Sequence, residues 1–210
     1  SKKKEVMAGI FWGFSIVIKL SPLVLIAYLI FTKRYITLIW GLILFALTNL
    51  IVMLMYPLTF EFFSKRLLAL TGLPAGNTTL YDQSLRAFLF RIGISNPETS
   101  QLIISVMLLI LVCTLTRHKP LKLFSLLLIV AAIGTSYTWQ HHFVYVFPAF
   151  IAASIRIYRQ KSLPYFLLTL VSAVLVGMHF PDIANPPAAN PFLVSHTLLG
   201  TTILFGLLLI

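Results

Sequence analysis

Charged residues are scarce in this chain. They make up 10% of its 210 residues, and only five of them are acidic. Soluble domains carry about 25% charged residues, so this chain has too few to cover a water-exposed surface. Its residues are 59% hydrophobic and its mean hydropathy is +0.97. The shortage of charge therefore predicts an all-α integral membrane protein.

Cysteine is also almost absent. The single cysteine, Cys113, lies within an apolar run, which excludes an intrachain disulfide and a thiolate metal cluster. The histidines do not show the spacing of a zinc site either. We therefore expect neither a bound metal ion nor a cofactor.

Long apolar runs occupy most of the sequence. A helix needs about 20 apolar residues to cross about 30 Å of hydrocarbon, and six runs after residue 34 approach this length. The shortest contains Pro148, so we expect a kinked or tilted helix whose freed backbone group is satisfied by neighbouring helices. The six runs are residues 35–57, 100–116, 121–137, 143–157, 163–179 and 195–210.

The apolar run 6–31 has two possible structures. It can form one kinked span, or two short helices that meet at Lys19-Leu20-Ser21-Pro22. One span would place the lysines at 2–4 opposite Lys33 and Arg34, whereas a hairpin keeps both clusters on one side, as the positive-inside rule favours. We predict the hairpin, with arms too short to cross the bilayer fully. The whole chain then has about seven to eight transmembrane or re-entrant helices.

This hairpin gives the chain a consistent orientation. Eleven of the 16 basic residues then lie on one face, which is therefore cytoplasmic. Because these residues anchor the topology beside anionic lipid, the net charge of +11 needs no nucleic-acid partner. The cytoplasmic set is Lys2, Lys3, Lys4, Lys33, Arg34, Arg117, Lys119, Lys122, Arg156, Arg159 and Lys161. The outer face carries Lys19, Lys65, Arg66, Arg86 and Arg91, with the acidic residues Glu61, Asp82, Glu98 and Asp182.

The largest extracytoplasmic loop is predicted over residues 58–99. A turn-forming stretch at 71–77 is followed by a short amphipathic helix. Its apolar stripe has the spacing i, i+3, i+4, i+7, and its arginines lie off that stripe. Two interpretations stay open: the arginines meet lipid phosphates at the interface, or Arg86 or Arg91 holds the phosphate of a bound substrate. The stripe is Leu85, Phe88, Leu89 and Ile92, and the polar residues beside it include Gln83 and Ser84.

Two further polar positions interrupt the apolar runs on this face. His141 and His142 follow Trp139 between two spans, where they can be an interfacial pair or can donate a hydrogen bond or a proton to a substrate. Lys19 either extends its ammonium group to water or contributes to the same site. The Pro-rich segment 181–191 is expected to be a stiff loop.

Three motifs, in this order, resemble the polyprenol-phosphate-sugar-dependent glycosyltransferases of family 87, which have the multi-span C-type glycosyltransferase fold. They are Ile18-Lys19-Leu20-Ser21-Pro22 followed by Lys33-Arg34, the segment DQSLRAFLFR at 82–91, and YTWQHHFVYVFPAF at 137–150. Their order and spacing cover most of the chain. Asp82 departs from the family pattern, in which asparagine is more frequent, and this leaves its role open.

The resemblance implies a multi-pass enzyme of the bacterial plasma membrane. It would transfer a hexose, with mannose the first expectation, from a polyprenyl-phosphate donor to a hydroxyl of a lipid or glycan acceptor on the outer face. Lys19, Gln83, Ser84, Arg86, Arg91, His141 and His142 are the substrate-binding candidates. The arginines and histidines would stabilise the departing lipid phosphate without a metal ion.

The resemblance also implies that the chain is incomplete. The general base in similar families is an aspartate in the first outer loop of the N-terminal half. We expect residues 1–210 to be a single membrane domain from the C-terminal part of a longer enzyme, inactive in isolation, because the chain lacks an initiator Met and stops within an apolar run. No catalytic carboxylate is therefore assigned.

Two other classes of protein remain alternatives. A glycan polymerase or ligase on the outer face would use similar cations but a lipid-diphosphate donor. A transporter would place polar groups near the bilayer midplane at broken helices. The polar residues here gather at one interface instead, which disfavours a transporter.

Overall fold

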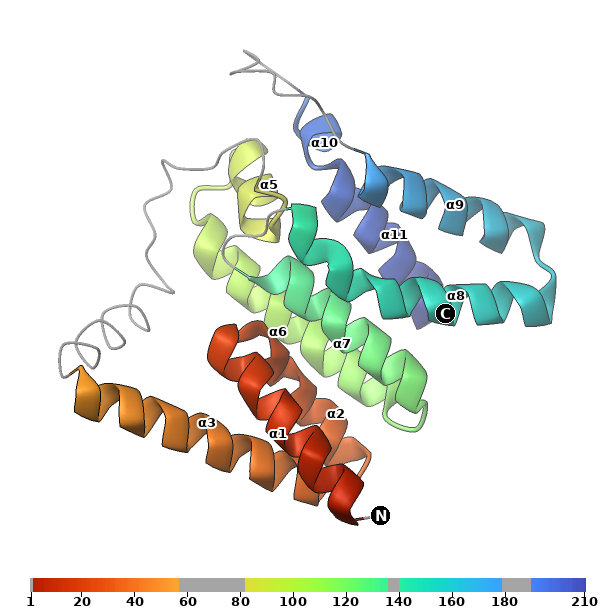
Figure 1. Cartoon of the computed structure of the whole chain (residues 1–210). Coiled ribbons are helices and arrows are strands. Elements are labelled where there is room, and N and C mark those ends of the chain that lie inside the picture. Colours follow the sequence, from red (N-terminus) through yellow and green to blue (C-terminus); the bar gives the residue numbers. More distant parts are fainter. Residues whose placement is uncertain (1, 57–81, 136–139, 179–189) are drawn as a thin grey trace. The chain divides into compact units, whose positions relative to one another are not determined.

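The structure is a computed structural model of the chain (Figure 1). It describes residues 2–56, 82–135, 140–178 and 190–210, without the side chains of Gln140 and His141. Helices and their connections make up all of these residues. The chain divides into two compact units, Ser1–Leu73 and Pro74–Ile210, and each unit is described by itself.

The first unit confirms the helical hairpin predicted for residues 6–31. The helical run breaks at Lys19 and Leu20, and Pro22 lies in the first turn of η1. Proline is tolerated there because a backbone N–H at this position would have no partner within the helix. Trp12 Nε1 donates a 3.1 Å hydrogen bond to the carbonyl of Pro22. Trp12, Ile16 and Leu29 then form a buried cluster between the two arms. The elements of this unit up to residue 56 are α1 (Lys2–Ile18), the 3-10 helix η1 (Ser21–Val24), α2 (Leu25–Phe31) and α3 (Tyr35–Met55).

Helices α1 and α3 pack backbone against backbone. A Cβ atom on Gly9 would lie 2.6 Å from the Thr37 carbonyl oxygen, and one on Gly13 would lie 2.8 Å from the Gly41 carbonyl oxygen. Thr37 Oγ1 also donates a 3.1 Å hydrogen bond to the Glu5 carbonyl. Small residues at spacing i, i+4 allow this close approach, as they do in many membrane helix pairs.

The second unit is built around α7. Every residue from Ser125 to Ile133 is buried, and α7 contacts α5, α6, η3, α8 and α11. Ser125 Oγ donates a 3.2 Å hydrogen bond to the Pro148 carbonyl, which ties α7 to α8. The helices of this unit are α5 (Leu85–Arg91), α6 (Pro97–Thr116), α7 (Pro120–Gly134), η3 (Gln140–Val146), α8 (Phe147–Gln160), α9 (Leu163–Gly177), α10 (Pro191–Val194) and α11 (His196–Leu209).

Helices α9 and α11 lie side by side (Figure 1). Ser172 Oγ donates a 2.7 Å hydrogen bond to the Gly200 carbonyl. His196 Nδ1 lies 2.7 Å from the Leu175 carbonyl oxygen, at the opposite end of the pair from the α11 C-terminus. A Cβ atom on Gly200 would lie 2.8 Å from the Ser172 carbonyl oxygen, so the glycine sets the close spacing of these helices.

Each apolar run predicted after residue 34 contains a helix, but the helices differ in length. Only α3 and α6, among the described residues, are long and apolar enough to cross a membrane by themselves. Shorter apolar helices cover Ser21–Phe31, Pro120–Gly134, Leu163–Gly177 and His196–Leu209. The expected seven to eight transmembrane or re-entrant helices stay a prediction.

The run 143–157, predicted to be a kinked or tilted helix, is divided between two helical elements. Residues Gln140–Val146 form η3, and α8 begins only at Phe147. Pro148 therefore lies in the first turn of α8, where its ring fits and no backbone hydrogen bond is lost. The change from η3 to α8 thus lies next to the proline, and the tilt of this run in a membrane stays a prediction.

Candidate functional site

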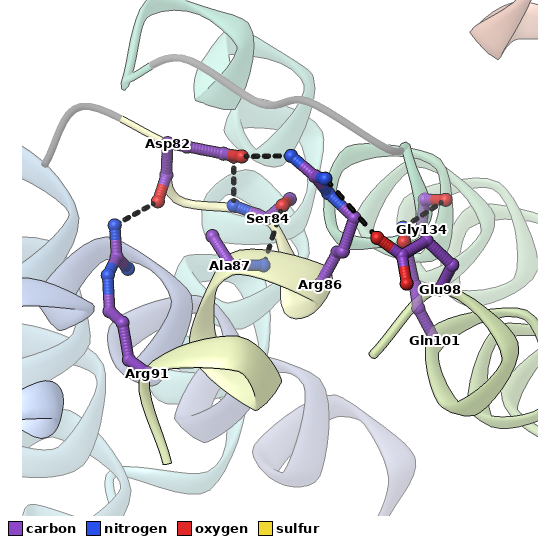
Figure 2. A network of polar contacts seen from close by, with 8 residues as sticks. All are labelled: Asp82, Ser84, Arg86, Ala87, Arg91, Glu98, Gln101 and Gly134. Carbon is purple, nitrogen blue, oxygen red and sulfur yellow. Dashed lines mark hydrogen bonds and ion pairs between the residues drawn. The ribbon is translucent and has the colours of Figure 1, made fainter. Parts of the chain in front are cut away.

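The predicted polar segment at 82–91 begins with a capped helix. Ser84 is the N-cap of α5, and its Oγ accepts a 3.2 Å hydrogen bond from the Ala87 N–H. Asp82 Oδ1 accepts a 3.0 Å hydrogen bond from the Ser84 N–H (Figure 2). These two short-range bonds satisfy donors at the start of the helix, as a Ser cap and an Asx turn commonly do. Ser84 therefore has a clear structural role.

Arg86 pairs with two carboxylates, and the one on Glu98 joins α5 to α6. Its Nη2 lies 3.3 Å from Asp82 Oδ2, and its Nη1 lies 3.5 Å from Glu98 Oε1 in the first turn of α6 (Figure 2). Arg86 is 2% exposed and Asp82 is 0% exposed. Buried charges of this kind persist only when they are paired, so each member of the group depends on the others.

Arg91 holds the same segment from its other side. Its Nη2 donates a 2.7 Å hydrogen bond to the Asp82 backbone carbonyl, and its Nη1 donates a 2.8 Å bond to Ser195 Oγ. Burial lowers the pKa of the Arg91 guanidinium, and the nearby Asp82 carboxylate raises it. The side chain is only half-buried, in contrast to that of Arg86.

Gln83 connects this segment to the break between α10 and α11. Its Nε2 donates a 2.8 Å hydrogen bond to the Val194 carbonyl, and its Oε1 accepts a 3.3 Å bond from the Thr197 N–H. The Phe88 and Phe192 rings meet edge to face, with centroids 5.5 Å apart. The segment 82–91 and the α10–α11 junction thus form one polar site, although they lie more than a hundred residues apart in the sequence.

The orientation of α5 differs from an interfacial helix whose two arginines meet lipid phosphates. Leu85 and Phe88 of the apolar stripe are only partly buried and Ile92 is exposed, whereas Arg86 is enclosed by protein. Ion pairs with Asp82 and Glu98 make this burial of the polar face possible. The helical wheel could not reveal it, because a wheel describes one helix without its neighbours.

The remaining predicted site residues are described less completely. His142 lies in η3 and is partly buried, and it is followed by the buried Phe143, whereas the His141 side chain is outside the described residues. Lys19 belongs to the first unit, where burial lowers the pKa of its ammonium group. Of the other charged residues predicted for the outer face, Glu61, Lys65, Arg66 and Asp182 are not among the described residues.

Ser195 and Thr197 were missed by the sequence analysis, and Glu98 was given no role. The sequence offered one signal, since Ser195, His196 and Thr197 are consecutive polar residues at the start of an apolar run. Gln101, one turn after Glu98, donates a 2.8 Å hydrogen bond to the Gly134 carbonyl and so fixes the end of α7 (Figure 2). Within the described ranges, no group of three or more His, Cys, Asp and Glu side chains could hold a metal ion.

Comparison with known proteins identifies the family. The curated proteins and the solved structures gave no match to the chain. A sequence model of glycosyltransferase family 87 matches residues 1–181, which include α5, η3 and the hairpin around Lys19. The resemblance seen in the three motifs is thereby confirmed, and the chain belongs to glycosyltransferase family 87, a family of membrane glycosyltransferases.

Proposed function

We propose that the enzyme containing this chain transfers a hexose, mannose in the first instance, from a polyprenyl-phosphate donor to an acceptor hydroxyl on the outer face of a bacterial plasma membrane. The observation that carries this proposal is the match of family 87 over residues 1–181. The polar site formed by α5 and the α10–α11 junction supports it, because the site combines guanidinium, amide and hydroxyl groups beside apolar helices. A polyprenyl phosphate complements such a site, because it combines a negatively charged phosphate with an apolar chain.

The reaction forms a bond between the acceptor oxygen and the anomeric carbon of the sugar, and it breaks the bond between that carbon and the donor phosphate. Positive charge develops on the sugar, and negative charge develops on the departing polyprenyl phosphate. A positioned cation stabilises that negative charge without requiring a metal ion. A general base accepts the proton of the acceptor hydroxyl.

The two arginines have different roles in this proposal. Arg91 is the candidate for contact with the donor phosphate, since its side chain is only half-buried and its guanidinium presents several donors. Arg86 is a positioning residue, because it is enclosed and holds Asp82 and Glu98. Gln83 and Ser84 fix the backbone around them, and Asp82 ties both arginines to one short segment.

His142 is the proposed second contact with the donor phosphate, and His141 and Lys19 are further candidates. His142 lies in η3, which packs against the buried helix α7, so the backbone that carries the imidazole is held by the core. A histidine can donate a hydrogen bond to a phosphate oxygen in either protonation state.

The test is a transfer assay with the full-length gene product in proteoliposomes. Polyprenyl-phosphate mannose should support transfer and release polyprenyl phosphate in equal amount, both with and without a chelator. GDP-mannose and a lipid-diphosphate-linked sugar are the comparison donors. Transfer from the lipid diphosphate alone would replace this proposal with the polymerase or ligase alternative, and transfer from the nucleotide sugar alone would contradict both.

A further inference from the structure

The second unit has another basic site, at the opposite end of α11 from its junction with α10. A cavity of about 510 Å³ lies between the start of α7, the C-terminal half of α8 and the end of α11. Four of its lining residues are charged, and all four are basic: Lys119, Lys122, Arg156 and Arg159. These residues belong to the face predicted to be cytoplasmic.

In the inner part of the cavity two of the cations are hydrogen-bonded to α11. Lys122 Nζ donates a 2.9 Å hydrogen bond to the Leu209 carbonyl, and Arg156 Nη1 donates a 3.1 Å bond to the Leu207 carbonyl. The Arg156 guanidinium also lies 4.7 Å from the centre of the Tyr165 ring. These hydrogen bonds hold the Lys122 ammonium and the Arg156 guanidinium against α11.

The outer part of the cavity leaves two cations exposed. Lys119 and Arg159 are exposed on its rim, one before α7 and one in the last turn of α8. Four like charges around one cavity repel one another, and an anion bound between them removes this repulsion. The remaining wall is largely apolar, with Leu121, Ile155 and Leu208 among its residues.

We propose that this cavity binds the phosphate group of an anionic membrane lipid, with the acyl chains of that lipid along the apolar wall. A free phosphate would use the four cations but not the apolar residues beside them. Arginine and lysine together suit a phosphate, since the guanidinium offers a planar pair of donors and the ammonium a compact charge. Basic pockets between membrane helices bind anionic lipid headgroups in this manner.

The chain offers a matched control for testing the proposal. Arg117 lies two residues before Lys119, and Lys161 lies two residues after Arg159, and neither lines the cavity. The double variants Lys119→Gln/Arg159→Gln and Arg117→Gln/Lys161→Gln therefore remove the same charge from the α6–α7 connection and the C-terminal end of α8. All four side chains are exposed, so both variants should fold, and thermal unfolding in phosphatidylcholine nanodiscs checks this.

Phosphatidylglycerol binding to the full-length protein is measured in phosphatidylcholine nanodiscs, by titration and by native mass spectrometry. The cavity variant should bind this lipid at least about tenfold more weakly, while the control variant stays within about twofold of the wild type. An equal loss in both variants would mean general attraction to a basic surface and would overturn the proposal, as would no loss in either. Binding of inorganic phosphate at similar affinity, without selective retention of phosphatidylglycerol, would assign the cavity to a soluble phosphate and would also overturn it.

Discussion

Arg91 and Ser195 are 104 residues apart in the sequence, yet Arg91 Nη1 lies 2.8 Å from Ser195 Oγ. This bond fixes the seven-residue helix α5 to the start of α11. A helix of this length is not stable by itself in water, so its position depends on contacts with its neighbours. The geometry of the candidate site is therefore a property of the packed second unit and not of the segment 82–91 alone.

We expect Arg91→Ala to reduce sugar transfer strongly. Loss of a charged contact that strengthens in the transition state costs on the order of 2–4 kcal/mol, or roughly 30- to 1000-fold in turnover. Arg91→Lys should recover only part of the rate, because an ammonium group lacks the two parallel donors of a guanidinium. The measurement is turnover of the full-length enzyme at saturating donor. Normal turnover in the alanine variant would remove Arg91 from the donor site.

Arg86→Ala should act mainly on stability. It would leave the buried Asp82 carboxylate and the Glu98 carboxylate without their cation, a loss of about 3–5 kcal/mol when a buried pair is broken. Thermal unfolding in detergent measures this effect. The triple variant Asp82→Asn/Arg86→Met/Glu98→Gln removes all three charges and should recover much of the lost stability. A single variant as stable as the wild type would contradict the role of Arg86 in holding Asp82 and Glu98.

The two histidines should not contribute equally to transfer. His141 and His142 are neighbours in the 3-10 helix η3, where successive residues point about 120° apart, so one substrate is expected to meet only one of them. We expect His142 to be that residue. Glutamine keeps a hydrogen-bond donor of similar size but cannot take up a proton. Activity that survives His142→Gln but not His142→Ala would indicate a hydrogen bond to phosphate, and loss in both would indicate proton transfer or a charged imidazolium. Full activity in these variants and in the matching His141 pair would exclude both residues from the site.

The predicted membrane orientation can be tested by labelling single cysteines in a Cys113→Ala background. Cysteines at Asn77, His141 and Asp182 should react with an impermeant maleimide added outside intact cells, whereas cysteines at Arg117 and Arg159 should react only after permeabilisation. This pattern follows from the positive-inside rule. Labelling of position 159 from outside, without labelling of position 141, would reverse the orientation.

Local features of the fold were predictable from the sequence, and the partners of the site residues were not. The apolar runs indicated the helices, and the proline after Lys19 and Leu20 indicated the break between the first two of them. Both signals depend only on residues that are close together in the sequence. The ion pair between Asp82 and Arg86 could have been predicted from the sequence, since these residues are four positions apart. The contacts of Arg86 with Glu98, and of Gln83 with Val194, depend on how helices assemble, and no single-helix pattern contains that information.

The complete burial of the middle of α7 has a consequence for the order of assembly. In the predicted topology α7 enters the membrane before α8 and α11, which follow it in the chain, so lipid or the insertion machinery surrounds it first. It exchanges that environment for protein only when the later helices have arrived, so insertion and packing are separate stages for this segment. Once enclosed, its 15 residues no longer need to match the thickness of the bilayer, since its neighbours and not lipid set the length that fits.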